Sequence, residues 1–185
     1  MSRLPLLSPE EARRRGAELG IPSTLSRLNA FRVLLHNTKV TGSLAQFVVA
    51  LLFQGTIDRR IRELVILRIG WRTASEYEFC QHVAIARQVG LKEEEIFGAR
   101  DPEACLSYDA RDRAVIRMTD ELLDRSTVSD ETWNVLRGFF DDAEIVELFL
   151  IAGNWRMVAG FLNGLDVPLD DGIESWPNGR RPARP

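Results

Sequence analysis

The segment EYEFCQH, residues 76–82, contains two carboxylates, a thiol and an imidazole within seven residues. Side chains of these types transfer protons or attack substrates as nucleophiles. Two chemistries are therefore open. In one, His82 activates the Cys80 thiol. In the other, Glu78 and His82 form an acid–base pair in which the cysteine has no part.

Helix geometry separates these two chemistries. The surrounding segment TASEYEFCQHVAIARQVG, residues 73–90, has helical periodicity. Successive helical residues lie about 100° apart, so Ser75, Glu78 and His82 share one narrow face and Cys80 points to the opposite side. A thiol activated by His82 would have to stand three or four residues away, and those positions hold no cysteine. The pattern therefore favours Glu78 and His82.

Glu78 and His82 have the spacing of a side-chain pair on a helix surface. A carboxylate beside an imidazole raises the pKa of the imidazole and fixes its orientation, which suits a general acid or base. Glu63 lies in the preceding apolar helical segment, IDRRIRELVILRIGWRT. The short connection GWRTAS makes the two helices antiparallel neighbours, so Glu63 is a candidate to face the same pocket.

Structural roles remain open for the residues on this helix. Ser75-x-x-Glu78 and Thr73-x-x-Glu76 both have the form of a capping box, so Glu78 can serve the helix N-terminus or pair with a surface side chain. His82 can equally be a core or interface histidine.

A structural role is also open for Glu63, and a metal site is a further possibility. Glu63 can pair with Arg59, Arg60 or another arginine. A metal ion could use the Glu63, Glu78 and His82 side chains, which have a suitable spacing. The chain has only two histidines, however, and His36 lies in a different segment. We therefore expect no metal.

Helical periodicity extends over almost the whole chain, and no segment alternates long enough to predict a sheet. The chain is therefore expected to be all-α. The expected helices cover residues 7–19, 23–37, 43–55, 57–73, 73–90, 92–98, 107–126, 129–140 and 141–165, with a break at Gly42.

Composition restricts the classes of function. The 185 residues suit one domain, and a 45% hydrophobic content is enough for a sizeable core. A net charge of −3 disfavours a nucleic-acid binder. The N-terminal residues lack the apolar core of a signal peptide, and the apolar runs at 48–53 and 148–153 are too short to span a bilayer. We expect a cytoplasmic protein without membrane or nucleic-acid partners, in which Cys80 and Cys105 are free thiols.

The segment RIRELVILRIGWRTASEYEFCQHVAIARQVGLKEEEI resembles the carboxymuconolactone decarboxylase family, within the alkylhydroperoxidase D-like superfamily. The resemblance is strongest over residues 45–98, and NWRMVAGFLNGLDVPL is similar to the C-terminal part of longer members. It implies a single-domain helical bundle that assembles as a dimer, trimer or hexamer. On this basis residues 1–40 form a helical extension, 41–168 the family domain, and 169–185 an arm or tail.

The peroxidase branch of this superfamily has a glutamate, two cysteines and a histidine at fixed spacing. Laid on this chain, the glutamate corresponds to Glu63 and the histidine to His82. The two cysteine positions hold Ser75 and Glu78. Dithiol chemistry needs two paired sulfurs, so the resemblance implies that this chemistry is absent. Cys80 lies on the wrong face to replace them.

The decarboxylase branch lacks the cysteines and keeps a Glu-x-x-x-His pattern, which Glu78 and His82 match. The resemblance therefore implies a cofactor-free lyase that decarboxylates a small carboxylated lactone or a related acid of aromatic catabolism. His82 would donate or accept the proton, Glu78 would orient His82, and Glu63 would act through Ser75.

Several side chains can shape a substrate pocket around these residues. Ser75, Trp71 and Tyr77 are the substrate-binding candidates near the catalytic group. Asn154, beside Trp155 in the last helix, offers a polar contact. More often such aromatic residues belong to the core.

Two other functions remain open. One is an alkylhydroperoxidase-like, peroxiredoxin-type antioxidant protein that uses Cys80, whose activity would be lost in Cys80→Ser. The other is a non-catalytic helical oligomer that binds a small ligand, whose role would survive Glu78→Gln and His82→Gln.

Overall fold

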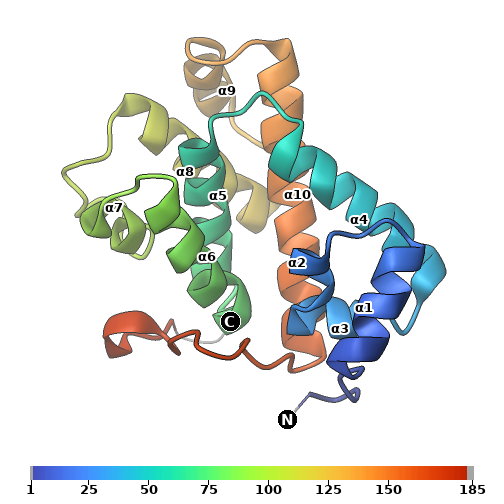
Figure 1. Cartoon of the computed structure of the whole chain (residues 1–185). Helices are drawn as coiled ribbons and strands as arrows, with labels where there is room; N and C mark the ends of the chain where they lie inside the picture. The colour runs from blue at the N-terminus through green and yellow to red at the C-terminus, as the bar shows by residue number, and fades with distance from the viewer. Residues whose placement is uncertain (1, 183–185) are drawn as a thin grey trace.

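The computed structural model describes residues 2–182, whose regular secondary structure is entirely helical, with no strand among them (Figure 1). The all-α prediction is confirmed. Residue 1 and residues 183–185, at the ends of the two predicted terminal segments, lie outside the described residues. The helices are α1 (Pro9–Glu18), α2 (Ser23–Ser26), α3 (Asn29–Leu34), α4 (Thr38–Phe53), α5 (Arg59–Arg72), α6 (Glu76–Gln88), α7 (Glu93–Gly98), α8 (Ala110–Arg125), α9 (Asp130–Arg137) and α10 (Asp142–Gly164), followed by a 3₁₀ turn η1 (Pro177–Gly179).

Helix α5 is the centre of the molecule, and Figure 1 shows it between α6, α8 and α10. Every residue from Ile61 to Gly70 is buried. A helix that is apolar on most sides is stable only when neighbours surround it. Glu63 is carried into the interior by this helix and therefore needs polar partners there.

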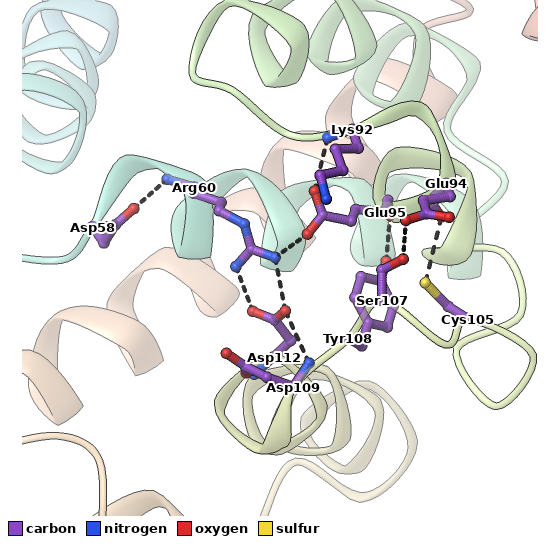
Figure 2. Close-up of polar contacts among 10 residues, drawn as sticks. All are labelled: Asp58, Arg60, Lys92, Glu94, Glu95, Cys105, Ser107, Tyr108, Asp109 and Asp112. Atoms are coloured by element: carbon purple, nitrogen blue, oxygen red, sulfur yellow. Dashed lines mark hydrogen bonds and ion pairs between the residues drawn. The ribbon is translucent and has the colours of Figure 1, made fainter.

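A charged network holds the N-terminal end of α5 against α7 and α8 (Figure 2). The Arg60 guanidinium donates to Asp112 Oδ1 at 2.6 Å and to Glu95 Oε1 at 2.5 Å. The Tyr108 hydroxyl donates to the Glu95 carbonyl, and Cys105 Sγ donates to the Glu94 carbonyl at 3.4 Å. The network fixes the position of α5 along its axis.

Helices α5 and α6 approach each other closely at Gly70. A Cβ atom on Gly70 would lie 2.8 Å from the Phe79 backbone nitrogen, closer than real Cβ atoms come. Only glycine permits this contact between the two backbones. The contact sets the register in which Glu63 and His82 meet.

The N-terminal helices form a small cluster of their own. Its buried members are Ala12, Ile21, Phe31, Leu35 and Ala45. The Arg3 backbone nitrogen donates to the Leu165 carbonyl at 2.8 Å, so the start of the described chain lies against the end of α10. This N-terminal unit lies beside the lower part of α10 in Figure 1.

Two expected boundaries are wrong. Gly42 does not interrupt the helix, because α4 runs through it despite a helix-propensity deficit of about 1 kcal/mol. The helix expected over residues 23–37 is two short helices. The Asn29 backbone nitrogen donates to Asp170 Oδ1 at 2.7 Å instead of to a preceding turn, so the C-terminal segment interrupts the helix.

The segment after α10 is irregular and passes along α6 towards α7. Trp176 is buried and stacks on Phe79 with ring centroids 5.6 Å apart. The Arg100 side chain donates to the Pro177 carbonyl at 2.7 Å. The tail is therefore packed on the bundle as far as Pro177.

Within residues 2–182, α10 alone is long and apolar enough to meet the composition of a membrane-spanning helix. A core helix meets the same criterion, and α10 packs against α4, α5, α6 and α8. Packing inside the bundle accounts for the apolar residues on its buried face.

Candidate active site: a buried Glu–His pair beside an apolar cavity

A cavity of about 150 Å³ lies between the N-terminal unit, α6 and α10. An apolar cavity of this volume accepts a benzene molecule. Its walls are mostly apolar, with a few polar side chains from α6 and α10. The lining residues are Leu25, Leu28, Ala30, Phe31, Leu34, Leu44, Val48, Leu52, Tyr77, Glu78, Gln81, His82, Ile85, Asn154, Trp155, Val158 and Leu162.

His82 lines the cavity and is held by partners on both ring nitrogens. Its Nδ1 lies 2.6 Å from Glu63 Oε2, and the Trp155 indole N–H donates to its Nε2 at 3.3 Å. Because Glu63 and Trp155 are both buried, the ring has little freedom to rotate. A donor at Nε2 places the hydrogen of the neutral imidazole on Nδ1, from which it is donated to Glu63.

Arg62 supports the buried Glu63 carboxylate. Its Nε lies 3.3 Å from Glu63 Oε1, and its Nη1 donates to the Leu52 carbonyl at 2.9 Å. Arg62 thus fills the place of the arginine partner expected for Glu63. Arg60 pairs elsewhere, and Arg59 is exposed. Glu63 bonds an arginine and the histidine at once, so the structural and functional interpretations of Glu63 coexist.

Glu78 faces the cavity beside the second ring nitrogen. Its Oε1 lies 3.8 Å from His82 Nε2, and its Oε2 has no hydrogen-bond partner among the described residues. Only 2% of Glu78 is exposed. Burial raises the pKa of this carboxyl to about 7, against the lowering effect of His82. Glu78 can therefore hold or release a proton near neutral pH.

The pKa of His82 is also displaced. Burial disfavours the charged imidazolium, but the Glu63 carboxylate outweighs burial by its charge and its hydrogen bond, so the pKa of His82 is raised. Glu78, with a carboxyl pKa of about 7, lies 3.8 Å from an imidazole whose pKa is raised, and the two groups form a unit that can exchange a proton with a ligand.

Neither of the two possible capping boxes forms. Ser75 stands at the N-cap of α6, but its side chain makes no capping bond and its buried Oγ has no partner among residues 2–182. Thr73 instead ends α5, where its hydroxyl donates to the Ile69 carbonyl. The expected action of Glu63 through Ser75 is wrong, because Glu63 contacts His82 directly.

The two aromatic candidates have different places. Tyr77 lines the cavity, and its hydroxyl donates to Asp170 Oδ2 at 2.5 Å. Trp71 lies outside the cavity and packs against Phe79, with ring centroids 5.8 Å apart. Trp71 therefore cannot contact a ligand in this cavity, because its position on α5 turns it towards the C-terminal tail.

Cys80 faces away from His82, as its helical position predicts. Its sulfur accepts a hydrogen bond from the Trp176 backbone nitrogen at 3.1 Å. Burial raises the pKa of the Cys80 thiol to about 11, which keeps it from forming the reactive thiolate. Cys105 is also a buried free thiol and belongs to the contacts of α7 and α8.

The three candidate ligands do not form a metal site. Glu63 and Glu78 lie against opposite nitrogens of His82, so the three side chains cannot converge on one ion. Among residues 2–182 no cluster of three histidine, cysteine or acidic side chains is arranged to hold a metal ion.

Sequence reasoning missed the polar roles of Gln81 and Trp155. Both line the cavity, together with Asn154. Gln81 is three residues from Glu78 on the same helix, a spacing that would have revealed it. Asn154 and Trp155 interrupt a nearly continuous apolar run, and polar groups in such a run are themselves a signal.

The bundle has the fold of alkylhydroperoxidase D-like proteins. The fold matches the alkylhydroperoxidase AhpD core of a peroxidase-related protein from Ralstonia eutropha JMP134 with a TM-score of 0.76, over 92% of this chain and 93% of that chain at 18% identity. It also matches the debrominase Bmp8 in complex with 2,3,4-tribromopyrrole, with a TM-score of 0.67 over 88% and 85% at 12% identity.

Residues 39–121 match the model of the carboxymuconolactone decarboxylase family. The segment includes Glu63, Glu78 and His82. A further relative is the uncharacterized protein YdfG of Bacillus subtilis, which is 26% identical over 111 residues, or 57% of this chain and 76% of YdfG. The resemblance predicted from the sequence is confirmed.

Proposed function

We propose that this protein is a cofactor-free acid–base enzyme that acts on a small, ring-sized molecule in the cavity. The reaction we favour is decarboxylation of a small carboxylated lactone or a related acid of aromatic catabolism. The observation that carries the proposal is the pairing of His82 Nε2 with Glu78 Oε1, 3.8 Å apart, on the wall of an apolar cavity.

In this reaction the bond between the ring carbon and the carboxylate breaks, and CO2 leaves. The electron pair moves towards the neighbouring ring carbonyl and forms an enolate. A protonated His82 delivers its Nε2 proton to the enolate, and the Glu63 carboxylate stabilises the imidazolium before that transfer. Glu63 thus takes the orienting role expected of Glu78, and Glu78 is the second proton carrier.

The cavity supplies an environment that favours loss of CO2. Its lining is chiefly apolar and, in the described part of the chain, contains no lysine or arginine. A carboxylate placed there loses its water shell without gaining an ion pair, so conversion into neutral CO2 relieves the charge. The same environment lowers the affinity for the substrate, and other contacts must hold the molecule.

The two other functions have less support. A Cys80-dependent peroxidase needs an accessible thiolate, whereas this thiol is buried beneath Trp176. A non-catalytic binding protein would use the same cavity but has no need of a Glu63–His82 hydrogen bond. We therefore place acid–base catalysis first.

Measuring CO2 release from 4-carboxymuconolactone tests the proposal. We expect turnover by the wild-type protein and a loss of about 100-fold or more in kcat/KM for His82→Ala, because a general acid contributes about 10²–10⁴-fold. Cys80→Ser is the matched control on the opposite face of α6 and should keep its activity. No release from this compound, related lactone acids or β-keto acids would contradict the decarboxylase proposal, as would full activity of His82→Ala.

A further inference from the structure

Asn154 has an unusual environment within the cavity wall. It is 5% exposed, and neither its Oδ1 nor its Nδ2 has a hydrogen-bond partner among the described residues. It lies on α10 directly before Trp155 and on the same helix face as Val158 and Leu162, which also line the cavity. The carboxamide therefore belongs to the wall, beside the group that bonds His82.

A buried carboxamide without partners is rare in native proteins. Buried side-chain polar atoms almost always bond protein or ordered water, because an unpaired donor in an apolar region is unfavourable. Here two polar atoms of one side chain are unpaired at once, and both belong to a cavity-lining residue. Such an arrangement is expected where a ligand supplies the missing bonds.

Two other N–H and O–H donors of the wall are already engaged. The Trp155 indole N–H donates to His82, and the Tyr77 hydroxyl donates to Asp170. The unpaired atoms Glu78 Oε2 and Gln81 Oε1 are acceptors when Glu78 is ionised. Among the buried unpaired atoms of the described lining, Asn154 Nδ2 is therefore the uncharged donor left for a ligand oxygen.

We propose that Asn154 Nδ2 binds the uncharged carbonyl oxygen of the ligand, so that the cavity selects ring-sized lactones or ketones. This inference rests on the proposed function. As the C–CO2 bond breaks, the carbonyl oxygen gains negative charge, and the Asn154 hydrogen bond becomes stronger in the enolate than in the substrate. The proton then comes from His82, and CO2 leaves as a neutral molecule. Asn154 is thus assigned to binding and to stabilising the enolate.

Two small probes separate the carbonyl contact from apolar packing. Cyclopentanone is an uncharged five-membered ring with a carbonyl, and methylenecyclopentane replaces the carbonyl oxygen with a CH2 group. Both are measured by NMR titration against the wild-type protein and Asn154→Leu, which keeps the side-chain shape and removes the donor. Asn163→Leu is the matched control, because that amide lies on the same helix but bonds the Thr73 carbonyl outside the cavity.

We expect Asn154→Leu to weaken cyclopentanone binding about five- to tenfold, the effect of one hydrogen bond, and to leave methylenecyclopentane binding equal or tighter. The infrared C=O stretch of bound cyclopentanone should lie at lower frequency in the wild-type protein than in Asn154→Leu, because a donated hydrogen bond weakens the C=O bond. Asn163→Leu should match the wild-type protein in both measurements.

Three results would overturn the inference. One is an equal loss of both probes in a folded Asn154→Leu protein, which would show packing alone. Another is unchanged cyclopentanone affinity and C=O frequency in that variant, which would show that the amide bonds ordered water and not the ligand. The third is failure of both probes to bind the wild-type protein.

These binding measurements need no turnover, so they test the role of Asn154 independently of the proposed reaction. Carbonyl-dependent binding without CO2 release would reject the reaction and keep the role of Asn154 in binding. CO2 release with an unchanged kcat/KM in Asn154→Leu would keep the reaction and reject the role of Asn154.

Discussion

The two ring nitrogens of His82 have different neighbours, and this difference determines where a proton can move. Nδ1 faces the Glu63 carboxylate at 2.6 Å, and a hydrogen held between them is not available to a ligand. Nε2 faces Trp155 and Glu78 at the cavity. The bond from Trp155 is long, at 3.3 Å, so a proton at Nε2 displaces a weak contact.

The raised pKa of Glu78 predicts a specific dependence of stability on pH. Between an ordinary value of 4.5 and about 7, the unfolded chain releases this proton while the folded chain keeps it, so stability falls as the pH rises. Above pH 7 both states are ionised and the loss is complete. The interval corresponds to about 3 kcal/mol. We expect Glu78→Gln to be more stable than the wild-type protein at pH 8, by up to about 3 kcal/mol, and much closer to it at pH 4.5.

Urea unfolding of both proteins at the two pH values measures this difference. Glu10→Gln removes the same charge from the exposed surface of α1 and serves as the control. If the advantage of Glu78→Gln were larger at pH 4.5 than at pH 8, the sign would be opposite to the prediction and Glu78 would be ionised in the fold at low pH.

Helical periodicity alone predicted the common face of Glu78 and His82, and the short α5–α6 connection predicted that Glu63 meets them. The division of roles between the two glutamates could not be predicted, because it depends on the rotation of α5 against α6. The same rotation places Trp71 away from the cavity. Asn154 and Trp155 come from a helix more than seventy residues away in the chain, and no local pattern identifies which of its faces meets α6.

At the scale of elements, the contact of α5 and α6 at Gly70 positions the catalytic pair. We expect Gly70→Ala to destabilise the fold by about 1–3 kcal/mol, because the new methyl group meets backbone atoms of Phe79 and forces the helices apart. Activity should fall as well, since the His82–Glu63 distance changes. Thermal unfolding and the CO2 assay measure the two effects.

Gly160→Ala is the matched control for this prediction. Gly160 is also inside a helix, but an added Cβ there would meet nothing within 4 Å. Higher helix propensity should stabilise this variant by up to about 1 kcal/mol. Equal effects of the two substitutions would show that helix propensity, and not the α5–α6 approach, determines the result at Gly70.

Most helices could be predicted because their apolar stripes and caps are local signals. Asp58, Asp109, Ser129 and Asp141 all cap the helices that follow them. The division of residues 23–37 could not be predicted in this way. It depends on Asp170, which takes the Asn29 backbone N–H from the other end of the chain. Tertiary bonds of this kind leave no trace in the local pattern.

At the scale of the whole molecule, α4 and α10 carry exposed apolar side chains. Val146, Leu150 and Met157 lie along α10 at helical spacing, and Val40 and Phe53 are exposed on α4. Exposed apolar side chains at helical spacing along one helix are typical of an interaction site. This arrangement agrees with the homo-oligomer predicted from the family resemblance, which stays a prediction.

We expect Leu150→Glu combined with Met157→Glu to shift the protein from an oligomer to a monomer, because two charges cannot be buried in an apolar interface. Sedimentation velocity measures the change. Leu106→Glu places a charge at an equally apolar but remote position in the loop before α8 and should leave the assembly intact. A wild-type protein that sediments as a monomer would contradict the prediction.

The segments that line the cavity lie far apart in the sequence, so they are synthesised at different times. Residues from Leu25 to Leu52 leave the ribosome first, α6 follows, and the wall containing Asn154 and Trp155 comes near the end. Until α10 emerges, the apolar cavity residues of the N-terminal segment and of α6 have no partner to pack against. A ribosome-bound chain ending before residue 142 should therefore expose this surface and associate with chaperones, whereas α8 can already dock on α5 and α7 on α6.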